Sequence, residues 1–432
     1  MEKFFKMSAR GTNVRREIVA GLTTFLAMAY ILAVNPKMLA NAGMDAGGVF
    51  TATALAACIA TLVMAFTANL PIALAPGMGL NAFFAFTVVL GMGISWKTAL
   101  TAVFLEGVLF IILSFFNVRE AIIKAIPSNL KKAVAAGIGL FICFIGFQNA
   151  GIIVNNDATL VGLGNLTQGS AAVAMIGLAL TAVLYALKIP GSILIGILVT
   201  TLIGIPFGVT SVPANWTPVS MPAAPLLFQF DFSRIFTLDF FAVFFTFLFV
   251  DIFDTVGTLV GVSSEAHIMD ANGNVPRVKQ ALLSDAIGTV AGACLGTSTV
   301  TSYVESTAGV AAGGRTGMTA LTTGVLFLLA LFLSPLFLLV PGAATAPALI
   351  IVGFLMLKAV TGINFNDVTE GLSAFITIVM MPFAYSIAEG IVWGIITYVF
   401  MKAATGKAKS IPVITWILFV IFILRLILTS RA

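Results

Sequence analysis

Two carboxylates stand inside an apolar stretch of the chain. Residues 249–261 read FVDIFDTVGTLVG and continue an apolar run that begins near residue 240. On a helix, the i,i+3 spacing places Asp251 and Asp254 on one face, followed there by Thr258 and Gly261. A charged group at the bilayer centre costs at least about 2.5–3.5 kcal/mol on insertion scales, so this acid pair is a candidate for function. The structural alternative is that both acids lie near a helix end, cap neighbouring loops and reach water.

The other polar candidates lie in two unusual apolar stretches. Asn81 follows the run APGMGL, and Glu305 closes the run TSTVTSYVE, which also contains Ser302 and Tyr303. Proline and glycine forbid a continuous helix in the first stretch, and β-branched and hydroxyl residues disfavour one in the second. We therefore predict a short extended strand followed by a half-helix in each. Non-helical backbone at membrane depth needs protein or a cavity around it, so both stretches indicate a transporter site.

The composition predicts a membrane protein. Of 432 residues, 60% are hydrophobic and only 9% are charged, whereas a soluble protein has roughly 25% charged residues. The three cysteines lie singly in apolar segments and the one histidine, His267, lies in a polar loop. We therefore predict no metal site, no disulfide framework and no cofactor.

Apolar runs long enough to cross a bilayer recur along the whole chain. We predict fourteen spans and one additional apolar segment at 411–428. The predicted spans are 16–37, 48–68, 71–92, 98–116, 131–149, 170–188, 190–208, 238–261, 279–295, 298–312, 316–340, 345–360, 368–386 and 388–402. Basic residues gather in the loops after even-numbered spans, and the positive-inside rule then places the N-terminal residues 1–15 in the cytoplasm. Examples in these loops or at the span ends beside them are Lys131, Lys188, Arg277, Arg315 and Lys402.

Weak internal similarity divides these spans into two halves. Residues 24–26 (TFL) match 246–248, and Ile59-Ala60-Thr61 matches Ile287-Gly288-Thr289 in the same order along the chain. The second match lays Gly77 against Glu305. Seven spans per half is an odd number, so the second half enters the membrane upside down. The predicted fold is an all-α polytopic membrane protein built as a 7+7 inverted repeat.

Two half-helices meeting across the pseudo-axis would enclose a polar pocket walled by Asp251, Asp254 and Glu305. Half-helix N-termini supply N–H groups and broken strands supply carbonyls. Such a site suits a planar heterocycle with ring N–H and carbonyl groups better than an inorganic anion. Because desolvation favours the neutral form of a carboxyl group, these acids could also carry a proton across.

Three pieces of sequence are specific enough to suggest a family. They are APGMGLNAFFAF from Ala75, FVDIFDTVGTLVG from Phe249 and TSYVESTAGVAAGGRTG from Thr301. With these pieces, residues 15–402 resemble the AzgA-like hypoxanthine/guanine/adenine permeases. That group is a branch of the nucleobase–cation symporter-2 (nucleobase/ascorbate transporter) family.

The resemblance implies a proton-coupled symporter of the cell membrane that imports purine nucleobases by elevator-like alternating access. Spans 1–4 (16–116) and 8–11 (238–340) would form a core domain. Spans 5–7 (131–208) and 12–14 (345–402) would form a gate domain through which two copies dimerise.

The resemblance also implies roles for individual residues. Glu305 would accept hydrogen bonds from ring N–H groups of the base, and Asn81 matches an asparagine associated with purine recognition. Spacing does not decide between the two aspartates. We expect Asp251, with Tyr303 and Ser302, to bind substrate beside Glu305 and Asn81. Asp254, together with Glu305, would carry the proton.

Three alternatives remain open at this stage. An anion transporter of the same 7+7 architecture should bring a basic group to the site, whereas the neighbouring groups here are acids. An intramembrane aspartyl enzyme would normally take its two acids from facing helices. A passive channel would not concentrate its substrate.

Overall fold

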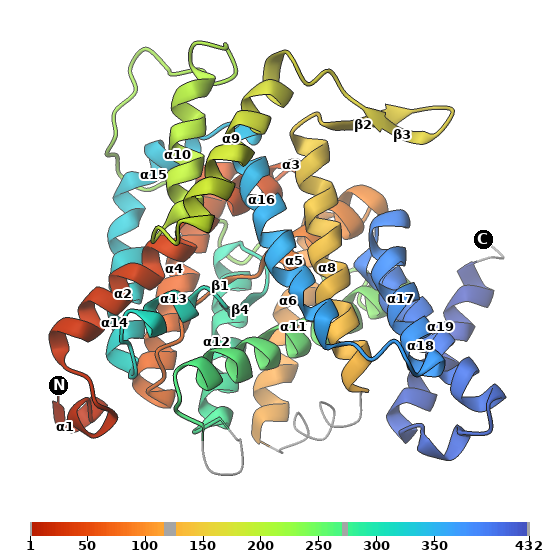
Figure 1. The fold of residues 1–432 in the computed structure, drawn as a ribbon. Coiled ribbons are helices and arrows are strands. Elements are labelled where there is room, and N and C mark those ends of the chain that lie inside the picture. The colour runs from red at the N-terminus through yellow and green to blue at the C-terminus, as the bar shows by residue number, and fades with distance from the viewer. Residues whose placement is uncertain (1, 116–126, 270–274, 430–432) are drawn as a thin grey trace.

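The computed structural model describes residues 2–115, 127–269 and 275–429, and these are mostly helical (Figure 1). Within these ranges, nine helical segments are long and apolar enough to cross a membrane, and three shorter apolar helices accompany them. The predicted all-α membrane fold is confirmed; the count of fourteen spans stays a prediction.

The first half of the chain begins with one kinked span. The predicted span 16–37 is α2 (Val14–Met28) and α3 (Ile31–Asn41), which meet at a turn where Leu32 N–H donates to Ala29 O. The other elements of this half are α1 (Glu2–Phe5), α4 (Ala46–Val63), β1 (Leu74–Pro76), α5 (Met78–Ala82), α6 (Trp96–Phe115), α8 (Ser128–Asn149), β2 (Ile153–Asn156), β3 (Leu160–Leu163), α9 (Gly169–Ala186) and α10 (Ser192–Gly204).

The second half begins with the helix that carries the aspartate pair. Its elements are α11 (Leu238–Glu265), α12 (Val278–Leu295), β4 (Val300–Ser302), α13 (Ser306–Ala311), α14 (Gly317–Ala330), α15 (Ser334–Leu338), α16 (Gly342–Leu357), α17 (Val368–Phe383) and α18 (Ile387–Ala404). The additional apolar segment forms α19 (Val413–Thr429) against α18. The loop expected at 150–169 contains an antiparallel hairpin, β2–β3.

Both interrupted stretches consist of a short strand followed by a half-helix. The strands β1 and β4 pair antiparallel in the middle of the molecule, with Ala75 opposite Thr301 as the central pair. After β1, α5 continues as a π-helical segment to Gly91, and after β4 the helix α13 is six residues long. Each strand therefore satisfies part of the backbone of the other at a depth where lipid could not.

In each half, the hydroxyl of one threonine is hydrogen-bonded to the first residue of the strand. The Thr61 hydroxyl donates to the carbonyl of Leu74 and accepts from its N–H, at 3.0 and 2.9 Å. The Thr289 hydroxyl makes the same two bonds to Val300, at 3.0 and 3.2 Å. These threonines end the two matching tripeptides in the sequence, so the internal repeat has a direct structural counterpart.

The register of the repeat differs from the expectation by two residues. Thr61 bonds a strand residue 13 positions later in the chain, whereas Thr289 bonds one 11 positions later. The segment between the threonine and the strand is therefore two residues shorter in the second half. Counting four residues from the central strand pair gives Gly79 in one half and Glu305 in the other. Gly79, not Gly77, is therefore the counterpart of Glu305.

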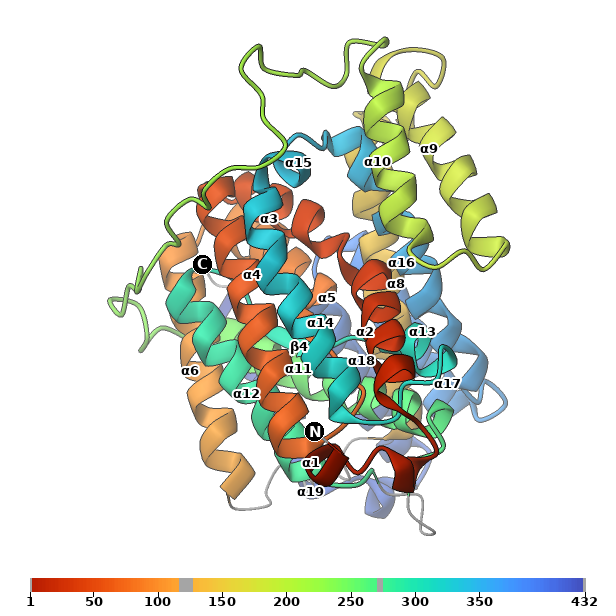
Figure 2. The ribbon, with the colours of Figure 1, turned by 90° about the vertical axis from the view of Figure 1, so that its left-hand side faces the viewer.

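The helices separate into two packing groups. The first, called the α8–α16 group here, contains α8, α9, α10, α16, α17 and α18; the second, the α4–α12 group, contains α2, α4, α6, α11, α12 and α14. Figure 2 shows α9 and α10 standing apart from α6 and α12. Assigning these groups to core and gate domains remains a prediction.

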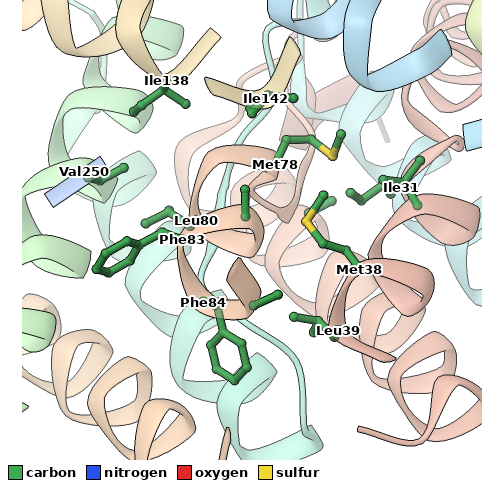
Figure 3. Packing of buried hydrophobic residues seen from close by; sticks show 14 of the residues in the cluster. Ile31, Met38, Leu39, Met78, Leu80, Phe83, Phe84, Ile138, Ile142 and Val250 are labelled. Atoms are coloured by element: carbon green, nitrogen blue, oxygen red, sulfur yellow. The ribbon is translucent and has the colours of Figure 1, made fainter. Parts of the chain in front are cut away.

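The half-helix after β1 packs against α3, α8 and α11, and it therefore touches both groups. Figure 3 shows its side chains between Ile31 and Met38 on one side and Ile138 and Val250 on the other. The approach to α8 is close, since a Cβ added at Gly79 would lie 2.6 Å from Ile138 Cγ2. Apolar packing of this kind fixes the half-helix beside the paired strands.

Candidate functional site

A cavity of about 50 Å³ lies where the paired strands meet α11 and α16. A water molecule needs roughly 10–15 Å³ by this measure, so the cavity has room for a few water-sized groups. Both packing groups contribute to its wall. The lining residues are Tyr30, Gly77, Met78, Gly79, Asp254, Thr258, Thr301, Ser302, Tyr303, Val304, Glu305, Val352 and Met356.

Glu305 directly precedes α13, so its carboxyl group stands where that half-helix begins. Its side chain is half-buried, and its Oε1 accepts a hydrogen bond of 2.6 Å from the hydroxyl of Tyr30. That distance lies within the range of about 2.5–2.7 Å for a hydroxyl donating to a carboxylate. Tyr30 comes from the turn between α2 and α3, so this turn and the start of α13 meet at Glu305.

Asp254 also faces the cavity. Its Oδ2 accepts a hydrogen bond of 3.2 Å from the Thr301 hydroxyl on β4. Thr258, one helical turn further along α11, lines the same wall. Asp254 and Thr258 share a face because an i,i+4 spacing nearly completes one turn.

Asp251 lies on a different strip of α11 and is not among the lining residues. It is fully buried, and its Oδ1 lies 3.4 Å from the Thr255 hydroxyl. The same hydroxyl lies 2.9 Å from Oδ1 of Asp285, a buried acid on α12. The structure therefore separates the predicted pair: Asp254 meets the cavity, and Asp251 belongs to the contact between α11 and α12.

Asn81 is also placed behind the cavity wall. Its Oδ1 accepts a hydrogen bond from the Ser298 hydroxyl, and its Nδ2 donates to the carbonyl of Pro76 at 3.4 Å. The Tyr303 hydroxyl donates to the same carbonyl at 2.6 Å. Asn81 and Tyr303 thus brace the end of β1, and Tyr303 lines the cavity as well.

Ser302 provides a polar group without a partner among the described residues. Its side chain is only 2% exposed, and its Oγ makes no hydrogen bond to that part of the chain. Buried hydroxyl groups are usually hydrogen-bonded, so an unpaired one at a cavity wall suits a ligand or water. Of the six predicted site residues, the structure therefore brings four to the cavity: Ser302, Tyr303, Glu305 and Asp254.

Tyr30, Val352, Met356 and Asp285 escaped the sequence analysis. Tyr30 sits in an ordinary apolar run, and the turn that aims it at Glu305 is a tertiary feature. Val352 and Met356 are spaced i,i+4 on α16, but so are many apolar pairs in this chain. Asp285 offered the one readable signal, since it is an acid inside the predicted span 279–295.

Two further polar contacts lie outside the cavity. Glu106 on α6 is fully buried, and its Oε2 accepts a hydrogen bond of 2.9 Å from the Thr299 hydroxyl. Glu17 on α2 accepts from the backbone N–H of Arg315 and from the hydroxyl of Thr319, so it caps α14. Within the described ranges, no group of three His, Cys, Asp or Glu side chains could hold a metal ion.

Solved structures of other transporters share this fold. The transmembrane domain of the cyanobacterial bicarbonate transporter BicA superposes with a TM-score of 0.65 at 16% identity, over 87% of this chain and 97% of that one. The murine anion transporter Slc26a9 gives 0.62 at 12% identity, over 90% and 68%. At such identities the likeness concerns the fold alone.

Sequence relatives match over the full length. A guanine/hypoxanthine permease of Bacillus subtilis is 49% identical, with 99% of each chain covered. An adenine permease of Escherichia coli is 45% identical, over 99% of this chain and 96% of that one. Residues 15–410 also match the model of a family described as the permease family. The chain belongs to this permease family, and it is a membrane transporter rather than an enzyme.

Proposed function

We propose that this protein is a proton-coupled symporter that imports the purine nucleobases hypoxanthine, guanine and adenine. The observation that carries the proposal is the convergence of Glu305, Asp254 and Ser302 on one cavity. Two carboxyl groups and a hydroxyl can accept the ring and amino N–H groups that purines present. The relatives named for adenine and for guanine and hypoxanthine support this substrate class.

The geometry supports a division of roles among the acids. Glu305 and Asp254 are half-buried and face the cavity, so they are the groups that can meet both substrate and proton. We assign base recognition to Glu305, with Ser302 and Tyr303 beside it, and proton coupling to Asp254 and Glu305. Asp251 and Asn81 lie behind the wall, and we infer that they act indirectly, through α12 and through the end of β1.

The position of the cavity supports an elevator-like mechanism. Val352 and Met356 come from α16 in the α8–α16 group, and the acids belong to elements that pack in or against the α4–α12 group. Sliding one group past the other would carry the acids and their substrate across, while α16 stays behind. In this proposal the α4–α12 group is the core domain and the α8–α16 group is the gate domain.

Location and assembly are part of the proposal. We infer a cell-membrane protein with a cytoplasmic N-terminus, because α1 and the basic segment after α18 lie at the same end of the molecule (Figure 1). The gate domain is the proposed dimer contact. Cross-linking in membranes between cysteines introduced on α17 would test the dimer, and its failure at every position would exclude that contact.

The test of the function is uptake by reconstituted protein. Proteoliposomes containing the purified chain are given radiolabelled hypoxanthine, guanine or adenine, with and without an imposed pH gradient. Concentrative uptake that collapses when an ionophore removes the gradient is the expected result. Uptake that ignores the gradient would remove proton coupling, and absence of purine binding would remove the substrate assignment.

An anion transporter is the second candidate, because the fold is shared with bicarbonate and anion transporters. The described lining of the cavity carries two carboxyl groups and no Lys, Arg or His side chain, which disfavours a bound anion. Thermal stabilisation of the purified protein separates the two candidates. Guanine should raise the unfolding temperature, and bicarbonate or sulfate should not.

A further inference from the structure

We propose that the Tyr30 hydroxyl takes the place of the substrate in the empty carrier. It donates a hydrogen bond to Glu305 when no base is bound, and it gives up that bond when an N–H group of a base binds the same carboxyl oxygen. The inference rests on the proposed function, because it takes a nucleobase N–H group as the competing donor. It adds a residue that controls the step in which the carrier returns without substrate.

The first observation is the chemistry of the pair. The Tyr30 hydroxyl is a donor, and it is 2.6 Å from Glu305 Oε1. A ring N–H of a purine is also a donor and would seek the same carboxyl group. A carboxylate offers about four lone-pair sites, so the base competes with Tyr30 where its N–H takes the site on Oε1 that the Tyr30 hydroxyl occupies.

The second observation is the room available. Tyr30 is fully buried and lines the cavity of about 50 Å³. A planar base is larger than the few water-sized groups that such a cavity holds, so its lining must move for a base to enter. Tyr30 stands at the turn between α2 and α3, where the helix is already interrupted and the backbone bonds follow an i→i+3 pattern.

The third observation is that the pair belongs to one packing unit. The half-helix α13 that follows Glu305 packs against α2, which leads into Tyr30. If the α4–α12 group slides past α16, Tyr30 travels with Glu305. A carboxyl group carried through a low-dielectric region needs a donor or a proton throughout. Tyr30 supplies that donor on the return journey, when no base is present.

The Tyr30→Phe variant separates this role from a plain loss of structure. Removing the competing donor should tighten equilibrium binding of hypoxanthine by about tenfold, the lower end of the range for a hydrogen bond to a charged group. Damage to the site would weaken binding instead. The matched control is Tyr385→Phe, the same chemical change at a ring that packs against Phe86 and Phe141.

Transport then provides the second readout. Net uptake requires the substrate-free return, whereas exchange of labelled for unlabelled base uses only the loaded carrier. In proteoliposomes at equal pH, Tyr30→Phe should lower the ratio of net uptake to exchange by about tenfold, and Tyr385→Phe should leave that ratio at the wild-type value.

Three results would overturn the inference. Weaker binding in Tyr30→Phe would make Tyr30 a direct substrate contact or a structural residue. An unchanged ratio of net uptake to exchange would remove its role in the return step. A wild-type protein that binds no purine would end the proposed function itself, and the inference with it, before any variant is made.

Discussion

The two interrupted segments share one geometry and differ in chemistry. Each has a strand that is hydrogen-bonded to a threonine and is followed by a half-helix. The two strands pair with each other, with Ala75 opposite Thr301 at the centre. Four residues beyond the central pair, one segment carries Gly79 and the other carries Glu305. Gly79 permits close contact with Ile138 of α8, whereas Glu305 presents a carboxyl group to the cavity. A nearly symmetric scaffold thus supports an asymmetric site, in which one half supplies the fit and the other supplies the charge.

The same division appears along α11. Asp254 meets the cavity, and Asp251 meets Thr255, which also bonds Asp285 of α12. Two acids three residues apart on one helix therefore lie in different surroundings, one at the cavity wall and one in the contact between α11 and α12. Position on the helix, rather than residue type, decides which acid reaches the cavity.

Along α11, the largest expected effect comes from changing Asp254, the acid that faces the cavity. Asp254→Asn keeps the size of the side chain but removes its titration. We expect the acceleration of hypoxanthine uptake by a pH gradient to disappear, a loss of about tenfold or more in proteoliposomes, as expected when a proton-transfer group is lost.

Asp251→Asn is the matched change one turn away. Hypoxanthine uptake by this variant should still depend on the pH gradient. Its unfolding temperature should fall, because the contact with α12 is weakened. If Asp251→Asn abolished the gradient effect and Asp254→Asn retained it, the comparison along α11 would be reversed.

A methyl group at Gly79 should have the next largest effect. The new Cβ would lie 2.6 Å from Ile138 Cγ2, and overpacking of this kind costs about 1–3 kcal/mol. We expect Gly79→Ala to slow uptake by about tenfold, with a smaller change in hypoxanthine affinity, because the glycine fits against α8 rather than holding the base.

The control for this change is Gly257→Ala on α11. An added Cβ there meets nothing within 4 Å, so uptake should remain near the wild-type rate. Equal losses in the two alanine variants would show that the close approach at Gly79 has no special role.

The smallest expected effect is that of a single hydroxyl. Ser302→Ala removes an Oγ that makes no hydrogen bond within the described chain. Affinity for hypoxanthine should fall by about fivefold, since one hydrogen bond contributes roughly 1 kcal/mol, while the unfolding temperature stays unchanged. Ser306→Ala should do the opposite, because its Oγ accepts from the N–H of Ala73 and serves the fold. Unaltered affinity in Ser302→Ala would take that residue out of the site.

Much of this arrangement could be predicted from the sequence. The proline and glycine residues around position 76 and the β-branched run before Glu305 marked the interrupted segments, because their backbone chemistry is local. The tripeptides ending at Thr61 and Thr289 revealed the repeat. Carboxyl groups in apolar runs stand out in any such chain.

What could not be predicted depends on tertiary contacts. The two-residue difference in register arises from unequal links after the threonines, which similarity of spans does not measure. The separation of Asp251 from Asp254 depends on where α12 packs, since either strip of α11 could have faced the cavity. Tyr30 reaches Glu305 through a turn between α2 and α3 that the apolar pattern of one predicted span conceals.

The most direct test of the central claim is calorimetric binding of hypoxanthine to the wild-type protein, Glu305→Gln and Glu106→Gln. The two variants make the same chemical change in two acids. Glu305 faces the cavity, whereas Glu106 accepts a hydrogen bond from Thr299 outside it. Gel filtration and thermal melting establish that both are folded. We predict binding by the wild type and Glu106→Gln, and no measurable binding by Glu305→Gln, which loses an acceptor and gains an unmatched donor. Wild-type affinity in folded Glu305→Gln would contradict the site.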